Sequence, residues 1–331
     1  MATFRKDPFG PAWVLISPER GLEASDFGSV GRPAPVSPLS PGQDAGLREI
    51  DARRPSGSRR DGPDWRIRVL EAPGRLLEDR PFEVRGTVPF LHAPARGRQE
   101  IVVEHPDPQA RIDRYPSDHL VDLLRVWRDR MARLADDPTV RHVQLVRNVG
   151  AQAGAEYAHP YATVLGSPVP NRWVDEERTA AEAYRSERGS CLFCDVLEHE
   201  CAERDRLVAQ NDRYVALTPW ASKTPFETWI VPRRHESAFG AEPVNALPDL
   251  ADLLRSVVRS MATALDDPPY HLLLHAVPKG GDEAYHWHLE VLPRLTRRAG
   301  FDWSSGYYVN PTPPEDAARF LREAAVLDGV G

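Results

Sequence analysis

The sequence predicts an α+β fold made of two diverged copies of one unit. Two segments of similar sequence begin at Leu120 and Leu250, and in both of them apolar residues recur at i, i+3, i+4 and i+7 before the chain reaches Asp-Asp-Pro. This is the pattern of an amphipathic helix that packs on one side of a sheet and then stops. Strand-like runs precede and follow each segment. The match is too long for coincidence, so we infer an internal repeat.

The first copy occupies the N-terminal half, which we place at residues 1–170. It opens with a hairpin over residues 4–20, whose turn lies at the sequence DPFG. Residues 31–63 are rich in proline, glycine, serine and arginine and predict an extended, mobile loop. The remaining elements are expected as strands at 100–108, 142–148 and 159–165 and a helix at 120–138.

The second copy occupies the C-terminal half, which we place at residues 191–331. A polar, charged linker at 171–190 connects it to the first copy and has room for one short helix. A final helix is expected at 313–326, where proline and acidic residues stand in the first turn. The repeated elements are expected as strands at 227–235, 271–277 and 286–292 and a helix at 250–268.

Composition excludes several classes of protein. The chain has 331 residues, a net charge of -7 and three cysteines. No apolar run reaches the ~18 residues of a membrane span, and the N-terminus lacks the apolar segment of a secretory signal, so we expect a cytoplasmic protein without a membrane partner. The acidic balance argues against a general electrostatic grip on nucleic acid. Three cysteines are too few for a disulfide scaffold.

Four residues of the second half have the types and order of a zinc site. Cys191 and Cys194 form a CxxC pair, and His235 and His286 follow at the ends of expected strands. Two thiolates and two imidazoles make a tetrahedral zinc set, and CxxC at a turn lets both sulfurs reach one ion. We therefore predict one zinc ion in this half. Cys201 is expected to be a small core residue or a bystander.

The sequence HWHLE gives a second signal beside the zinc site. Residues two apart in a strand share a face, so His288 lies beside His286 and is expected to face a cleft. An oriented neutral imidazole can serve as a nucleophile or a general base. A second metal ligand and a hydrogen-bonded surface histidine are equally open interpretations. His275, on the neighbouring expected strand, could join the cluster around a second ion.

The first half lacks the zinc ligands of the second. Aligning the two copies places His159 and Tyr161 where the second copy has its HWH histidines. Pro108 occupies the position that corresponds to His235. Ser37 and Ser40 occupy the positions that correspond to Cys191 and Cys194. Serine and proline cannot replace soft zinc ligands. We therefore predict that the first half has no zinc site of this type.

Several motifs resemble a known enzyme family. They are RKDPFGPAWVLISPER, RNVGAQAGAEYAHPYATVLGSPVP, CLFCDVLEHE, PFETWIVPRRH and YHWHLEVLPR. They resemble galactose-1-phosphate uridylyltransferases and ADP-glucose phosphorylases of the histidine triad superfamily, over nearly the whole chain. The resemblance implies two tandem histidine-triad-like halves that form a mixed, half-barrel antiparallel sheet with packed helices, commonly as a homodimer. It also implies nucleotidyl transfer in two displacements, in which the second histidine of an HPH motif in the first half carries the nucleotidyl group.

The chain departs from this family pattern where the chemistry would occur. Tyr161 stands at the nucleophilic histidine, and tyrosine is a poor nucleophile at neutral pH. Glu156 and Thr163 stand where the family has a serine and a glutamine that contact phosphate, and a carboxylate there would repel a diphosphate. The resemblance implies substrate contacts from Arg20, Asn148, Gly150, Gly154, Thr163 and Tyr307.

Three functional hypotheses follow. In the first, the protein is a repurposed enzyme that acts on a nucleotide, a sugar phosphate or a related small molecule, with Tyr161, Glu156 and His159 as candidate catalytic groups. A variant of this hypothesis places catalysis at His288 beside the zinc site. Ordinary uridylyl transfer is not expected. In the second, the protein is a catalytically silent binding or regulatory protein on the same scaffold. In the third, the CxxC pair performs redox chemistry.

Overall fold

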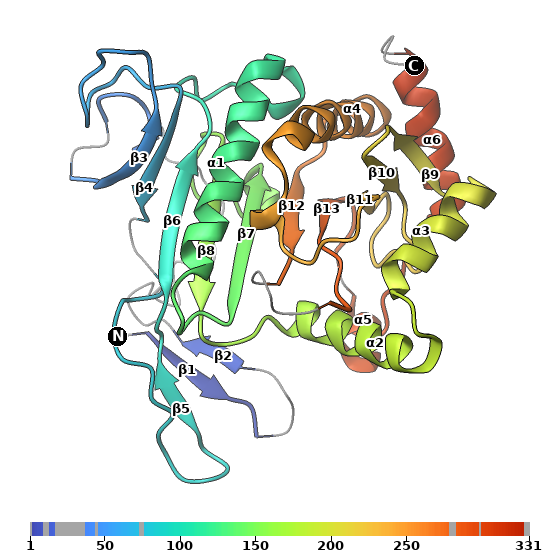
Figure 1. Ribbon diagram of the computed structural model, residues 1–331, viewed down its shortest axis with the longest axis horizontal. Coiled ribbons are helices and arrows are strands. Elements are labelled where there is room, and N and C mark those ends of the chain that lie inside the picture. Colours follow the sequence, from blue (N-terminus) through green and yellow to red (C-terminus); the bar gives the residue numbers. More distant parts are fainter. Residues whose placement is uncertain are drawn as a thin grey trace.

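One open sheet of ten strands forms the centre of the molecule (Figure 1). The computed structural model describes residues 2–8, 13–16, 37–43, 46–72, 76–277, 283–297 and 299–327. The strand order is β3-β4-β6-β8-β7-β12-β13-β11-β10-β9, and neighbouring strands pair in antiparallel fashion. The sheet does not close into a barrel. With helices packed on it, the sheet confirms the predicted α+β class.

The sheet repeats one strand arrangement in its two halves. The order β3-β4-β6-β8-β7 of the first half is matched by β9-β10-β11-β13-β12 of the second. The first half contributes β3 (Glu49–Arg53), β4 (Ile67–Glu71), β6 (Arg98–Val103), β7 (His142–Val149) and β8 (Tyr161–Ser167). The second contributes β9 (Leu207–Gln210), β10 (Tyr214–Leu217), β11 (Thr228–Pro232), β12 (Tyr270–His275) and β13 (His288–Pro293).

The two halves join through the pairing of β7 with β12. The register runs from Val149 opposite Tyr270 to Leu145 opposite Leu274. Leu145 and Leu274 are fully buried, and they point to the same face of the sheet because they are directly opposite each other. The sheet is therefore continuous through the join.

The two repeated helices cover one face of this sheet. They are α1 (Ser117–Ala135) and α4 (Leu247–Leu265), each of 19 residues, and they contact one another. Their apolar stripes, including the matched Leu124 and Leu254, belong to one hydrophobic core that runs through both halves. The helix α6 (Pro314–Leu327) packs beside α4 and β9, as expected for the C-terminal segment.

The segment expected to be a linker is mostly a helix. α2 (Arg172–Arg188) begins at Asn171, whose side chain accepts a hydrogen bond from the backbone N–H of Trp173, and is followed by α3 (Leu192–Glu203) and later by the short α5 (Gly300–Ser305). Val174 and Ala181 bury the inner side of α2 against the second half. None of the helices in the described ranges is long and apolar enough to cross a membrane.

A second, smaller sheet lies at the N-terminal end. It contains β1 (Thr3–Lys6), β2 (Trp13–Ile16) and β5 (His92–Pro94), so both strands of the predicted hairpin are present. The expected mobile loop at 31–63 differs from the structure, because it contains β3. Ion pairs hold that strand: the Glu49 carboxylate lies 2.7 Å from the Arg68 guanidinium. Because the segment is rich in arginine and proline, its composition does not indicate the strand, which ion pairs stabilise.

The shared core predicts that the two halves unfold together. Leu124→Ala and Leu254→Ala each remove a fully buried side chain from it, so the free energy of unfolding should fall by about 2–5 kcal/mol in each variant. Tryptophan fluorescence and far-ultraviolet circular dichroism in guanidinium titrations should still report one coincident transition.

Arg133→Ala, at an exposed position of α1, is the matched control. It should change the free energy of unfolding by less than about 0.5 kcal/mol. Two separate transitions in the wild-type protein would contradict the single core.

Candidate functional site

The four predicted zinc ligands lie together in the second half. Cys191 is the N-cap residue of α3 and Cys194 stands in its first turn, whereas His235 follows β11 and His286 precedes β13. The Cys194 Sγ lies 3.5 Å from His235 Nδ1 and 3.7 Å from His286 Nδ1. One ligand atom from each residue falls within 4.8 Å of all the others. Soft sulfur and imidazole donors at such separations fit a tetrahedral zinc ion.

Protonation at this group argues against redox chemistry. Burial and the neighbouring Cys191 raise the pKa of the Cys194 thiol to about 12 in the metal-free chain. A thiol of that kind is mostly protonated at neutral pH and reacts slowly. Burial and the nearby His235 lower the pKa of His286 to about 3, so its imidazole is neutral and able to bind a metal. Four protein ligands form a closed set, which is typical of structural zinc.

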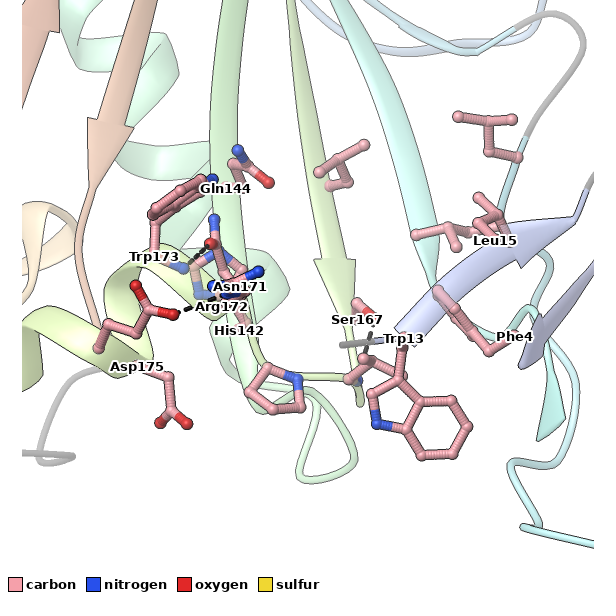
Figure 2. Close-up of a pocket in the computed structure, with 16 residues that line it drawn as sticks. Phe4, Trp13, Leu15, His142, Gln144, Ser167, Asn171, Arg172, Trp173 and Asp175 are labelled. Carbon is pink, nitrogen blue, oxygen red and sulfur yellow. Dashed lines mark hydrogen bonds and ion pairs between the residues drawn. The ribbon is translucent and has the colours of Figure 1, made fainter. Parts of the chain in front are cut away.

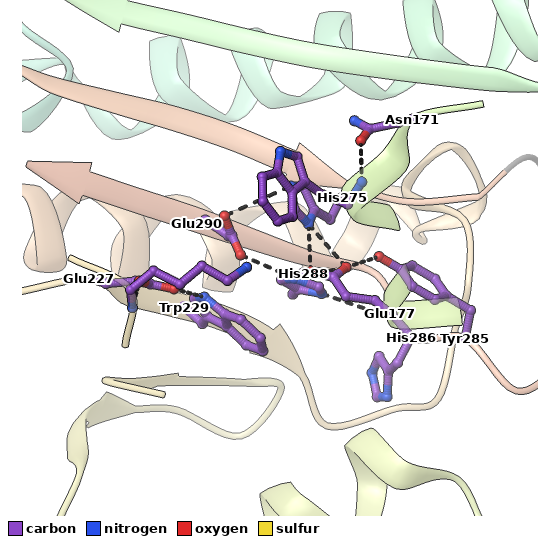
Figure 3. Close-up of polar contacts among 11 residues, drawn as sticks. Asn171, Glu177, Glu227, Trp229, His275, Tyr285, His286, His288 and Glu290 are labelled. Atoms are coloured by element: carbon purple, nitrogen blue, oxygen red, sulfur yellow. Dashed lines mark hydrogen bonds and ion pairs between the residues drawn. The ribbon is translucent and has the colours of Figure 1, made fainter. Parts of the chain in front are cut away.

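A second group of ionisable side chains lies beside the first. It comprises Glu177 of α2, His275 of β12 and His288 and Glu290 of β13 (Figure 3). The Glu177 carboxylate lies 3.1 Å from His275 Nδ1, and the His288 Nε2 lies 3.7 Å from the Glu290 carboxylate. One ligand atom from each residue falls within 4.8 Å of the others. Imidazole and carboxylate donors of this kind could hold zinc, iron or manganese.

Charge holds this second group together in the metal-free chain. Burial opposes ionisation of Glu177, yet the hydrogen bond from His275 and the charge of His288 lower its pKa to about 2. Burial likewise opposes protonation of His275, but Glu290 and Glu177 raise its pKa above the usual value. The two opposite shifts reflect attraction between the His275 imidazole and the carboxylates of Glu177 and Glu290.

His288 is enclosed instead of facing a cleft. Its side chain is fully buried, and the Trp229 ring stacks on it at 4.4 Å between centroids. The centroid of the Phe193 ring lies 5.5 Å from the centroid of the His288 ring. The expectation that the strand alternation turns this imidazole toward open space is therefore wrong, because aromatic side chains from β11 and α3 close over it.

A cavity of about 700 Å³ opens beside this enclosed group. Its wall contains two residues of the ionisable group and several further charged side chains. The basic, acidic and histidine residues of the wall are Lys223, Glu227, His275, Glu290, Arg294, Arg297 and Asp302. The three basic side chains form no ion pair with any residue in the described ranges. Such a wall can attract an anion such as a phosphate.

Glu227 is the most perturbed carboxyl group of that wall. It is 1% exposed and accepts hydrogen bonds from the backbone N–H of Lys223 at 2.6 Å and from the indole N–H of Trp229 at 3.0 Å. Burial and the charge of Glu290 raise its pKa to about 7. A carboxyl group with this pKa can both donate and accept a proton near neutral pH.

In the first half, Tyr161 occupies the position at which the resemblance predicts a nucleophilic histidine, and its side chain is buried. Tyr161 packs among apolar side chains and its hydroxyl oxygen accepts a hydrogen bond of 3.0 Å from the backbone N–H of Glu156. Burial raises the pKa of Tyr161. His159 Nε2 donates to the carbonyl oxygen of His105 at 2.8 Å, and burial lowers the pKa of this imidazole. The apolar partners of Tyr161 are Leu39, Trp65, Leu70, Ala72, Ile101 and Val103.

The serines at the lost cysteine positions build a turn. The Ser37 Oγ accepts a hydrogen bond from the Leu39 N–H, and the Ser40 N–H donates to the Ser37 carbonyl oxygen. The turn brings Leu39 into the same buried apolar cluster as Tyr161. This part of the first half is therefore packed as core.

The residues that the resemblance predicts as substrate contacts lie in different places. Asn148, Gly150 and His159 line a cavity of about 570 Å³, in which Gly150 has a φ of 83° and Asn148 Oδ1 lies 2.8 Å from His271 Nδ1. Gly154, with a φ of 79°, follows this loop, and Thr163 lies within β8. Tyr307 is 68% exposed after α5 in the second half. Arg20 lies outside the described residues.

Basic residues of the first-half cavity are already paired. Arg147 lies 2.8 Å from the Glu104 carboxylate and donates to the Tyr270 hydroxyl. Arg111 pairs with Asp113 and Asp267. Among the described residues that line this cavity, no cation is left without an acidic partner, in contrast to the cavity of the second half.

Sequence reasoning missed three acidic residues of the second half. Glu290 could have been found, because it lies two residues after His288 and therefore on the same face of β13. Glu177 lies in the supposed linker, and no local pattern connects it with histidines a hundred residues later. The raised pKa of Glu227 depends on burial and on the nearby Glu290, which no local sequence pattern indicates.

The chain belongs to the galactose-1-phosphate uridyl transferase family. The profile of the N-terminal domain of that family matches residues 78–171, and the profile of its C-terminal domain matches residues 177–316. These two matches cover both halves of the internal repeat. The family consists of enzymes that transfer nucleotidyl groups, which confirms the resemblance seen in the sequence.

Several proteins are similar over almost the whole chain. ADP-glucose phosphorylase of Arabidopsis thaliana is 29% identical over 97% of this chain and 93% of its own. Galactose-1-phosphate uridylyltransferase of Thermotoga maritima is 25% identical over 98% and 99%. The crystal structure of the Arabidopsis thaliana enzyme with bound ADP-glucose covers 98% of this chain and 99% of its own, with 26% identity and a TM-score of 0.75.

The candidate zinc site predicts a loss of metal on substitution. Cys194→Ser should lower the zinc content, measured by inductively coupled plasma mass spectrometry, by about one ion per chain, because one thiolate ligand is lost. The melting temperature should fall as well. Cys201→Ser is the matched control and should keep the wild-type zinc content. Equal zinc in both variants would contradict the site.

Proposed function

We propose that this chain is an enzyme that transfers a phosphoryl or nucleotidyl group from a nucleotide sugar or a sugar phosphate to an acceptor, with its chemistry in the second half. The observation that carries the proposal is the contrast between β8 and β13. At the family position in the first half, an apolar cluster encloses Tyr161. On the corresponding face of the second half, ionisable side chains adjoin a cavity whose wall carries three basic and three acidic side chains.

The basic side chains of the second-half cavity supply the means to bind phosphate. Lys223, Arg294 and Arg297 line it without acidic partners among the described residues. Phosphate recognition in proteins relies on such donors, which also stabilise the negative charge that moves during transfer. The paired arginines of the first-half cavity are committed to acidic side chains and offer no equivalent.

Glu227 is the proposed proton-transfer group. In its ionised form it would take the proton of the acceptor hydroxyl while the acceptor oxygen bonds to phosphorus and the bond from phosphorus to the leaving oxygen breaks. The leaving phosphate or phosphate ester departs as an anion, which the basic side chains hold. No covalent histidine adduct is needed, so transfer occurs in one displacement.

Zinc bound by Cys191, Cys194, His235 and His286 has a structural part in this proposal. It would tie the start of α3 to the start of β13, and its closed ligand set leaves no position for substrate. A metal held by the second group would act as a Lewis acid on a phosphate oxygen. The side chains of the chain itself bind phosphate and move the proton.

Turnover of a substrate panel tests the proposal. Nucleotide sugars and nucleoside triphosphates would be incubated with phosphate or sugar phosphates as acceptors, and products would be separated by mass-resolved chromatography. Glu227→Gln should lower kcat by about 100-fold or more, because it removes the proton acceptor. Lys223→Ala should raise KM through lost phosphate binding.

Tyr161→Phe is the matched control in the first half and should leave turnover within about twofold. If Tyr161→Phe abolishes turnover and Glu227→Gln does not, the chemistry belongs to the first half. Tight binding of a panel member without any conversion would favour the silent binding protein.

The raised pKa of Glu227 predicts a pH-dependent stability. The folded state holds this proton up to about pH 7, whereas the unfolded chain releases it near the ordinary pKa of 4.5, so the stabilisation is present below that pKa and is lost as the pH rises through 7. Relative to Glu227→Gln, the wild-type free energy of unfolding should therefore fall by about 3 kcal/mol between pH 4 and pH 8.

Urea titrations at several pH values measure this difference. Glu198→Gln, at an exposed position of α3, is the control and should show no such trend relative to the wild type. A difference between wild type and Glu227→Gln that stays constant with pH would show that Glu227 titrates normally.

A further inference from the structure

A separate cavity of about 490 Å³ lies between the small N-terminal sheet and the main sheet. Its walls are mostly apolar and include three aromatic rings. Figure 2 shows Trp173 of α2 on one side of the space and Phe4 and Trp13 of the small sheet on the other. Apolar walls with aromatic rings on facing sides suit a flat ring system.

One edge of this cavity carries polar groups from β7. His142 and Gln144 lie two residues apart and therefore share the face of β7 turned away from α1. His142 is 6% exposed, and its Nε2 has no hydrogen-bond partner among the described residues. The Gln144 amide makes no hydrogen bond within the described part of the chain. Both side chains line the cavity.

An unpartnered buried nitrogen is costly, because it loses water without gaining a replacement. Burial and the charge of His275 lower the pKa of His142 to about 3, so the ring is neutral and offers one N–H and one lone pair. The adjacent amide offers both a donor and an acceptor. Together these groups match a ligand that has hydrogen-bonding atoms on one edge.

The charges around the cavity are compensated. Asp175 lies 2.9 Å from the Arg178 guanidinium, and Arg172 lies 2.6 Å from the Glu176 carboxylate. No described lining residue therefore presents an unpaired charge of either sign. The cavity lined by Lys223, Arg294 and Arg297 shares only Trp173 with this one. The compensated charges of the present cavity disfavour phosphorylated ligands.

We propose that this cavity binds a neutral heteroaromatic molecule with a hydrogen-bond donor and an acceptor on one edge, such as a purine base or its nucleoside. The ring lies between the aromatic walls, and its polar edge meets Gln144 and His142. A glutamine amide forms two such bonds with the donor and acceptor edge of adenine. The inference is independent of the proposed transfer reaction.

The first test uses adenine, purine and adenosine monophosphate as probes. Isothermal titration calorimetry on the full chain should show that adenine binds more tightly than purine, which lacks the exocyclic amino donor. Adenosine monophosphate should bind this cavity no more tightly than adenine, because no free cation meets its phosphate.

Variants locate the site. Gln144→Leu should weaken adenine binding about tenfold, through the loss of two hydrogen bonds. Leu165→Trp should abolish binding by filling the cavity, since Leu165 lies directly opposite Gln144. Gln43→Leu, at an exposed position, is the matched control and should bind adenine as the wild type does.

His142→Leu provides a readout that does not depend on a ligand. Replacing a buried, unpartnered imidazole by an apolar side chain should leave the melting temperature unchanged or raise it, while adenine binding falls. Absence of binding by adenine and purine, or binding that Gln144→Leu and Leu165→Trp leave unchanged, would overturn the proposal. A strong preference for adenosine monophosphate that Leu165→Trp removes would also overturn it, because the ligand would then be an anion.

Discussion

The pairing of β7 with β12 is the interaction on which the rest of the structure depends. It turns two five-stranded sheets into one, so that α1 and α4 can share a core on the same face. A buried ion pair lies close to this join: Arg147 of β7 contacts Glu104 and also donates to the hydroxyl of Tyr270 on β12. Separating the halves would expose two edge strands and remove the Tyr270 hydroxyl from the Arg147 guanidinium, which would keep only Glu104 as its partner.

The continuous sheet also explains why the polar groups gather on its other face. Helices fill the α1 and α4 side with apolar contacts, so alternation along the strands sends the remaining side chains to the opposite side. In the second half, α2 and α3 cover that side and bring Glu177 and the two cysteines to the histidines of β12 and β13. In the first half, the turn at Ser37 brings Leu39 instead, and the same side becomes core.

Local sequence patterns predict much of the fold but only part of the candidate site. The apolar periodicity after Leu120 and Leu250 identified both helices, because amphipathic helices carry their packing face in their sequence. The four candidate zinc ligands could be predicted because CxxC and HWH are short motifs that contain ligand-type side chains. The place of Glu177 in the second ionisable group could not be predicted, since only the folded structure brings α2 close to β13. The enclosure of His288 depends on Trp229 and Phe193, whose directions follow from neighbouring elements.

The join also bears on how such a protein can change over time. When two identical subunits form a common sheet, each substitution in the chain appears in both subunits. Here both halves belong to one chain, so a residue such as Tyr161 can alter one half while His288 remains in the other. Each half still supplies its share of the core. Covalent fusion thus lets the two halves differ at corresponding positions while both keep the scaffold that they share.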